Sequence, residues 1–234
     1  LNVYTGGCEH QCDYCYCQGI GAWSDYPRAR NLAGLERDAV IADRQILLSF
    51  MGDPYAPIER RYRNTRHALS VLSAARCSVA ILSKGGTICL DDLDIFAEWP
   101  EGRIKVGATL TFMDAEKSKA HEPGAALPEE RLAALDVLSC AGVKTWASIE
   151  PVIDPAESLK IIEESLPFVD AYKVGKLNHR RNDTNWEEFG REAVEMIRNA
   201  GKALYVKDDL RAAMTGAIFS DAESDCGSLC LPDR

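Results

Sequence analysis

Short apolar runs alternate with longer amphipathic segments along most of this chain. Apolar runs rich in Val, Ile and Leu predict strands that are buried on both faces, and the segments between them have helical spacing. The pattern predicts about seven strands. The expected strands span 2–5, 45–50, 77–83, 104–112, 143–150, 169–175 and 202–207, and the expected helices span 57–75, 90–99, 128–142, 157–166 and 185–201.

Alternation of strand and helix is typical of a parallel sheet covered by helices. By this pattern, an open doubly wound sheet and a partial (β/α) barrel fit equally well. The sequence contains no Gly- or Ser-rich linker, repeat or low-complexity segment. We therefore expect one domain over residues 1–215, followed by a C-terminal tail over 216–234.

The composition is that of an ordinary globular protein, with 46% hydrophobic and 27% charged residues among 234. The formal net charge of −9 argues against a broad surface that coats nucleic acid, although local basic patches stand at 59–67 and 178–182. No apolar run is long enough to span a bilayer, and the start does not resemble a signal peptide. These features predict a cytoplasmic protein that makes no membrane contact.

Polar groups follow nearly every predicted strand. In parallel α/β folds, ligands bind where strands end and loops begin. A ring of Lys, Thr, Asp and Glu at these ends is what a site for a charged ligand requires. The segments concerned are GDPY (52–55), SKGG (83–86), TLTF (109–112), EP (150–151), KVGKLNH (173–179) and VKDD (206–209).

Nine cysteines suggest metal or redox chemistry in a reducing compartment. Cys8, Cys12 and Cys15 have the spacing C-x3-C-x2-C, and Cys17 follows closely. A zinc site remains one interpretation, with His10 and Cys17 available to complete the set. In the other interpretation, three thiolates hold an iron–sulfur cluster and leave one iron open to bind and activate a ligand.

The C-x3-C-x2-C spacing resembles the signature of radical S-adenosylmethionine (SAM) enzymes. Further segments, in the right order, resemble the spore photoproduct lyase-like (anaerobic DNA repair photolyase-like) group over most of the chain. They are CEHQCDYCY, GDPYAPIERRYRNTR, ILSKGG, EPGAALPEERLAAL and KVGKLNH. The resemblance implies a partial (β/α) barrel of the TIM type. It also implies a [4Fe-4S] cluster, SAM as cofactor, and a one-electron donor such as flavodoxin or ferredoxin.

Carried over residue by residue, the resemblance assigns the cluster to Cys8, Cys12 and Cys15. It assigns contacts with SAM to six other residues, of which Lys84 would pair with the SAM carboxylate. Tyr14 and Tyr16 match tyrosines that support radical return in the lyases. The six residues implied to bind SAM are Gly52, Asp53, Lys84, Thr109, Thr111 and Glu150.

One departure concerns the hydrogen donor. Photoproduct lyases carry a donor cysteine three residues before the aspartate that Asp53 matches, and this chain has Phe50 there. We therefore expect SAM cleavage without the lyase reaction. Among the remaining cysteines, Cys77, Cys89 and Cys140 are expected in the core, whereas Cys226 and Cys230 lie in the tail.

Three hypotheses for function follow. The first is a radical SAM enzyme that acts on a nucleic-acid or nucleotide-like substrate, supported by the resemblance and by RRYRNTRH (60–67). If that segment is helical, Arg60, Arg63 and His67 share one face. The second is a radical SAM enzyme that modifies a peptide or small metabolite. The third is a non-catalytic zinc or iron–sulfur module, which leaves the polar strand ends unexplained.

Overall fold

A six-stranded parallel sheet forms the centre of the molecule, and each strand pairs with its neighbour in sequence. The computed structural model describes residues 1–19, 21, 23–24, 26–41, 45–49, 51–100, 102–177 and 183–229. The sheet contains β3 (Ile46–Leu48), β4 (Val79–Ser83), β5 (Ile104–Thr109), β6 (Lys144–Ile149), β7 (Ala171–Val174) and β8 (Ala203–Val206).

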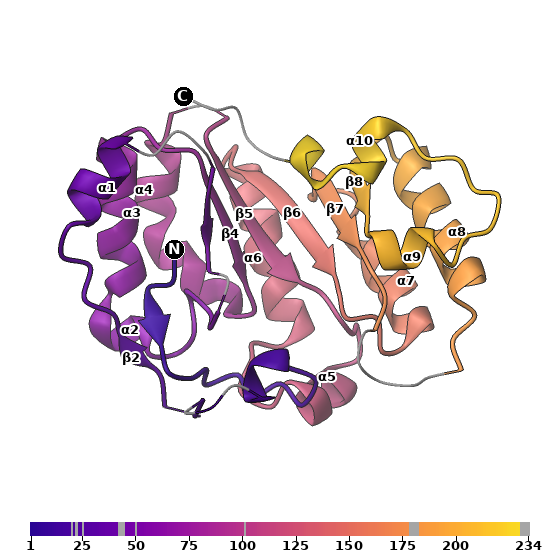
Figure 1. Cartoon of the computed structure of the whole chain (residues 1–234), viewed down its shortest axis with the longest axis horizontal. Coiled ribbons are helices and arrows are strands. Elements are labelled where there is room, and N and C mark those ends of the chain that lie inside the picture. Colours follow the sequence, from indigo (N-terminus) through magenta and orange to yellow (C-terminus); the bar gives the residue numbers. More distant parts are fainter. Residues whose placement is uncertain are drawn as a thin grey trace.

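The strand order decides between the two topologies that the sequence allows. A doubly wound sheet reverses its order at a switch point and carries helices on both faces. Here the order never reverses, so right-handed crossovers place the helices on the same side. The fold is a partial (β/α) barrel of the TIM type with helices outside, as predicted, and α6 lies behind the sheet in Figure 1.

The helices begin and end where local chemistry favours it. In α6, Pro128 occupies the first turn and Glu130 accepts a hydrogen bond of 2.8 Å from the backbone N–H of Leu127. The helices are α1 (Leu35–Ile41), α2 (Glu59–Tyr62), α3 (Asn64–Ala74), α4 (Leu93–Ala97), α5 (Ala115–His121), α6 (Pro128–Cys140), α7 (Pro155–Ser165), α8 (Trp186–Asn199), α9 (Asp208–Arg211) and α10 (Asp221–Ser224). The 3₁₀ segments are η1 (Tyr16–Gly19), η2 (Gly86–Asp92) and η3 (Cys226–Leu229).

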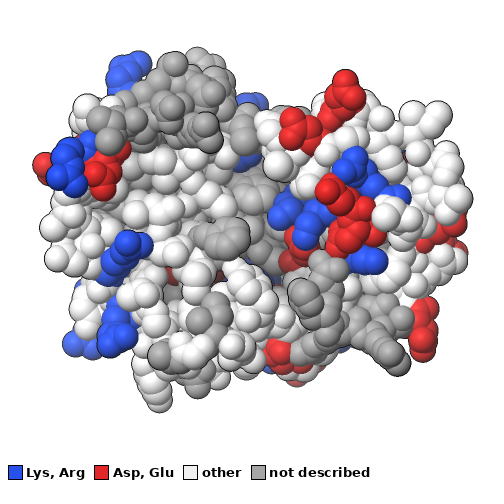
Figure 2. Space-filling model, in the orientation of Figure 1, with Lys and Arg blue, Asp and Glu red and all other residues white. Residues whose placement is uncertain are grey.

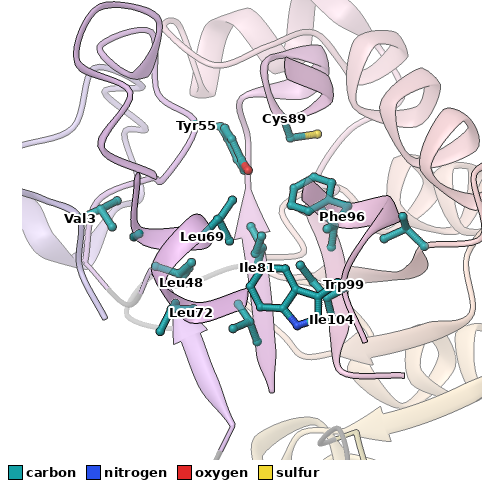
Figure 3. Close-up of a cluster of buried hydrophobic side chains, with 14 of the residues drawn as sticks. Val3, Leu48, Tyr55, Leu69, Leu72, Ile81, Cys89, Phe96, Trp99 and Ile104 are labelled. Atoms are coloured by element: carbon teal, nitrogen blue, oxygen red, sulfur yellow. The ribbon is translucent and has the colours of Figure 1, made fainter. Parts of the chain in front are cut away.

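Two apolar clusters fill the space between the sheet and its helices. Figure 3 shows the first, in which Leu48 and Ile81 of the sheet meet Leu69 and Leu72 of α3. The second joins β6, β7 and β8 to α7 and α8. Because both clusters occupy the helix side, the other face of the sheet is available for a site.

Two elements of the structure differ from those that the sequence pattern predicts. The strand expected at 2–5 is β1 (Tyr4–Thr5), but it pairs antiparallel with β2 (Arg28–Ala29) outside the main sheet. The helix expected over 57–75 is broken at Arg63, whose φ of 53° is left-handed. The buried Glu59 explains the break, because its carboxylate accepts hydrogen bonds from the first backbone N–H groups of α3.

The break also changes the basic patch at 59–67. Arg60, Arg63 and His67 do not lie on one continuous helix, so the expected shared face is wrong. Arg66 pairs with Asp92 at 2.9 Å and with Asp94 at 2.5 Å, which neutralises part of the patch. Figure 2 likewise shows acidic side chains beside basic ones on the face in view.

The cysteines outside the N-terminal segment are divided between core and surface. Cys77 and Cys89 are buried, as expected. Cys140 is exposed, contrary to expectation, because it lies off the face of α6 that buries Leu135 and Leu138.

In the expected tail, Glu223 of α10 pairs with Arg198 of α8 at 2.6 Å. None of the described helices has the length and apolar character needed to cross a membrane.

Candidate active site at the carboxyl ends of the strands

A cavity of about 210 Å³ brings the N-terminal cysteines together with the ends of three strands. Its walls come from the cysteine segment, from the loop after β3, and from β4 and β5. Residues separated by about a hundred positions in the chain therefore face one space. The predicted site residues on its walls are Cys8, Cys12, Tyr14, Cys15, Tyr16, Gly52, Asp53, Lys84 and Thr109.

The cysteine segment is fastened to the loop that follows α5. The backbone N–H of Asp13 donates to the carbonyl of His121 at 3.0 Å, and that of Gly124 donates to the carbonyl of His10 at 3.1 Å. A side chain at Gly124 would collide with the carbonyl oxygen of Glu9. Only glycine permits this close approach of two backbones. In Figure 1 the indigo N-terminal segment accordingly lies beside α5.

Asp53 connects the loop after β3 to the end of β4. Its carboxylate accepts hydrogen bonds from Ser83 Oγ at 2.6 Å and from the backbone N–H of Lys84 at 2.7 Å. His10 Nε2 lies 3.1 Å from the same group. Burial alone would raise the pKa of Asp53, but the imidazole and these hydrogen bonds hold it at about 2. Asp53 is therefore an ionised carboxylate beside the cavity.

Lys84 supplies positive charge to the cavity. Its Nζ lies 5.6 Å from the centre of the Tyr14 ring, over the ring face. It makes no ion pair with any side chain of the described ranges. Burial alone would lower the pKa of Lys84, but the neighbouring Cys12 and Glu122 raise it overall. Lys84 as a whole is half-buried and lines the cavity, where its ammonium group can meet an anionic ligand.

A buried polar network lies next to the cavity. Arg131 and Glu122 form an ion pair at 2.5 Å, and Arg131 also donates to the carbonyl of Thr109 at 3.0 Å. The hydroxyl of Tyr14 donates to Glu122, as does that of Thr111 at 3.1 Å. Burial and the nearby carboxylate raise the pKa of Tyr14 well above its usual value. The network therefore links the cysteine segment to the end of β5, and it engages the hydroxyl of Thr111.

Glu150 does not line this cavity in the part of the chain that the structure describes. Its carboxylate forms ion pairs with Lys207 and, at 3.3 Å, with Lys173. These groups lie at the carboxyl ends of β6, β7 and β8. The predicted role of Glu150 toward SAM stays a prediction.

The thiols of the N-terminal segment are the kind of donor that iron–sulfur clusters use. Among the described side chains, no three of the Cys, His, Asp and Glu type converge on one metal position. A [4Fe-4S] cluster requires a different arrangement, because each thiolate binds a different iron. Cys8, Cys12 and Cys15 line one cavity, and their binding of a cluster stays a prediction. Burial raises the pKa of the Cys8 thiol to about 12.

Sequence analysis did not identify Glu122 and Arg131. A signal was present, since Arg131 occupies the apolar face of α6 together with Ala134 and Leu135. A charged residue at a core position predicts a buried partner. The sequence suggests His10 only as a zinc ligand, because no local pattern reveals its contact with Asp53. Phe50, Cys230 and the basic segment 178–182 lie outside the described residues.

Comparisons with known proteins agree with this geometry. No family model matches the chain. Among solved structures, a mutant of spore photoproduct lyase superposes with a TM-score of 0.69 at 14% identity, over 88% of this chain and 74% of that one. SuiB of Streptococcus suis bound to S-adenosylmethionine superposes with a TM-score of 0.68 at 14% identity, over 92% of this chain and 52% of SuiB. The fold is thus that of the radical SAM enzymes, and the predicted resemblance is confirmed at this level.

Relatives with similar sequences show which family the chain belongs to. The uncharacterized protein MJ0683 of Methanocaldococcus jannaschii is 32% identical over 186 residues, which are 76% of this chain and 70% of the relative. The chain belongs to the same family as that protein. The uncharacterized protein Rv2578c of Mycobacterium tuberculosis is 26% identical over 168 residues, and the match covers 65% of this chain and 49% of the relative.

Proposed function

We propose that the protein is a radical SAM enzyme. The observation that supports this most is the cavity in which three cysteines with C-x3-C-x2-C spacing face Lys84. A non-catalytic module has no need of an ammonium group beside its cysteines that forms no ion pair with the described side chains. The fold shared with spore photoproduct lyase and SuiB gives the proposal independent support.

In this proposal, Cys8, Cys12 and Cys15 hold the cluster. When bound, a [4Fe-4S] cluster with one open iron supplies the electron that cleaves SAM to a 5′-deoxyadenosyl radical. Lys84 pairs with the SAM carboxylate, a charge-assisted contact. Gly52 contacts the SAM amino group through its backbone.

Asp53 supports the contact with the SAM amino group. It does so either directly or by fixing the backbone N–H of Lys84, which donates a hydrogen bond to its carboxylate. Thr109 is the better candidate of the two threonines, because the hydroxyl of Thr111 is engaged by Glu122. Glu150 acts farther from the cysteines, toward the substrate side.

The tyrosines flanking Cys15 have different surroundings. Tyr14 is held by Glu122 beside the cavity, whereas Tyr16 is 58% exposed. We assign Tyr14 the role of shielding the cluster side and supporting radical return. Tyr16 faces the open side, where a substrate or an electron donor such as flavodoxin or ferredoxin approaches. Both assignments rest on the resemblance and on the cavity walls.

The proposed substrate is a nucleic acid or a nucleotide-like molecule, handled in the cytoplasm. One of the similar lyase structures contains a dinucleoside spore photoproduct, and one of the SuiB structures contains its precursor peptide SuiA. The sequence segments that resemble the photoproduct lyase-like group favour a nucleotide-like substrate over a peptide. Phe50 has no weak X–H bond to give, so SAM cleavage without repair of thymine photoproducts is expected.

Anaerobic reconstitution tests the proposal. Iron and sulfide analysis with electron paramagnetic resonance should show one cluster, and each Cys→Ala change at 8, 12 or 15 should abolish it. Cys17→Ala is the matched control and should keep the cluster, although Cys17 also lines the cavity. With dithionite, the protein should release 5′-deoxyadenosine from SAM. Stoichiometric zinc, or a cluster that survives the triple variant, would refute the proposal.

A further inference from the structure

Side chains on the concave face of the sheet form a row that crosses it from the cysteine cavity. Strand register pairs Thr109 with Ser148, Ser148 with Lys173 and Lys173 with Tyr205. On β4, Ser83 pairs with Ala108, so Lys84 follows beside Thr109. Neighbouring strands lie about 4.8 Å apart, which places the backbone of Lys173 about 14 Å from that of Lys84.

Strand alternation determines which face these residues occupy. On β7, Tyr172 and Val174 are buried in the apolar cluster on the helix side. Successive side chains point to opposite faces, so Lys173 points to the concave face. Leu204 and Val206 occupy the helix side of β8 in the same way, which places Lys207 on the concave side. The row therefore shares its face with the cysteine cavity.

Two lysines meet one carboxylate at the far end of this row. Glu150 Oε2 lies 3.3 Å from Lys173 Nζ, and Oε1 forms an ion pair with Lys207 Nζ. The side chains of Lys173, Lys207 and Glu150 are 31%, 27% and 20% exposed, so the group is open to solvent. Figure 2 shows basic and acidic side chains gathered over the half of the sheet where β7 and β8 lie.

The backbone beneath the group makes room for it. A side chain at Gly175 would lie 2.8 Å from Lys207 Cδ and 3.2 Å from Glu150 Cδ. One carboxylate balances only one of the two ammonium groups in contact with it. Asp209 also acts on Lys207, but more weakly than Glu150 does. Lys173, with the longer contact, is the ammonium group that is more readily redirected to a ligand.

We propose that Lys173 and Lys207 bind a phosphate group of the substrate, with Glu150 holding the two lysines in place until the phosphate arrives. This inference rests on the proposed function for the identity of the substrate as nucleotide-like. Ammonium groups that arrive from two strands suit a tetrahedral phosphate, whereas a planar carboxylate is best matched by the fork of an arginine. A nucleotide anchored there extends back along the row toward Lys84.

Binding of thymidylyl-(3′→5′)-thymidine, measured by isothermal titration calorimetry, tests the site. Lys173→Ala and Lys207→Ala should each weaken binding about tenfold, the effect of one lost charge-assisted contact. Lys144→Ala is the matched control and should bind like the unchanged protein. Lys144 lies at the amino end of β6, is 62% exposed and pairs with Asp170 at 3.6 Å. Glu150→Gln should bind the dinucleotide severalfold more tightly, because the competing carboxylate is gone.

The last expectation separates binding from a merely structural role. If the lysines only stabilise Glu150, then Glu150→Gln leaves dinucleotide affinity unchanged or lowers it, and the inference is wrong. Absence of dinucleotide binding, equal affinity in all four variants, or lysine-dependent binding of an acidic peptide in its place also overturns it. Cluster content and SAM cleavage are measured on the same samples. Lysine-dependent dinucleotide binding without a cluster would refute the proposed function and leave the phosphate site standing.

Discussion

Glu122 and Arg131 form an ion pair at 2.5 Å with side chains that are 0% and 1% exposed. The pair lies between the cysteine segment and β5, since Glu122 also accepts from Tyr14 and Arg131 also donates to the carbonyl of Thr109. Burial would raise the pKa of Glu122, but Arg131 and Lys84 lower it, so the carboxylate is ionised. A single buried ion pair thus connects the cysteine segment with the strand that carries Thr109.

Glu122→Gln should destabilise the fold strongly. Removing one partner leaves a buried guanidinium uncompensated, which costs about 3–5 kcal/mol. Urea unfolding followed by fluorescence measures the change. The matched control is Lys119→Gln on α5, which removes an exposed pair with Glu116 and should cost less than about 1 kcal/mol. An equal loss of unfolding free energy in the two variants would show that the buried pair stabilises the fold no more than the exposed pair does.

Gly124→Ala should displace the cysteine segment. The added methyl group would collide with the backbone at Glu9, so iron content after reconstitution should fall together with the melting temperature. Gly21→Ala is the control, because a Cβ at Gly21 meets no described atom within 4 Å. Normal iron loading in Gly124→Ala would show that the segment can shift without losing the cluster.

Lys84→Met should weaken SAM binding by about tenfold to a hundredfold while sparing the cluster. The methionine keeps the length of the side chain and removes its charge. Calorimetry on reconstituted protein measures the affinity, and the absorbance of the cluster reports its integrity. Lys105→Met serves as control, because Lys105 lies over the Trp146 ring at 5.4 Å on the same face of the sheet. Unchanged SAM affinity in Lys84→Met would remove this residue from the site.

Acidification should release the C-terminal helix α10. The hydrogen bond from Arg198 lowers the pKa of Glu223 from 4.5 to about 2. A carboxyl group whose pKa is lower in the folded state stabilises the fold above its unfolded pKa and loses that contribution as pH falls through the folded value. Amide exchange protection over 221–224, corrected for intrinsic rates, should therefore fall between pH 4.5 and about 2.

In Glu223→Gln, the same protection should already be low at neutral pH and should not change in that window. Asp221→Asn, which leaves the Arg198 contact in place, should behave like the unchanged protein. Persistent protection in Glu223→Gln would show that apolar contacts, and not this ion pair, hold α10 against β8.

Sequence alone determined the order of the secondary-structure elements and predicted that the N-terminal cysteines share one site. Six apolar runs became the six strands of the sheet because a run buried on both faces has few alternatives to a parallel strand. The spacing of Cys8, Cys12 and Cys15 predicted a shared site, and the three cysteines do line one cavity. Such local patterns are readable because neighbouring residues alone produce them.

Only the tertiary structure decided what depends on contacts between distant segments. The break at Arg63 follows from Glu59 capping α3, and no periodicity within 57–75 reveals it. The partners of Glu150 come from β7 and β8, and strand register is set by the sheet as a whole. Glu122 meets Tyr14 across 108 positions of sequence. Composition and spacing carry no information on such pairs, because the energy that selects them exists only once the chain is packed.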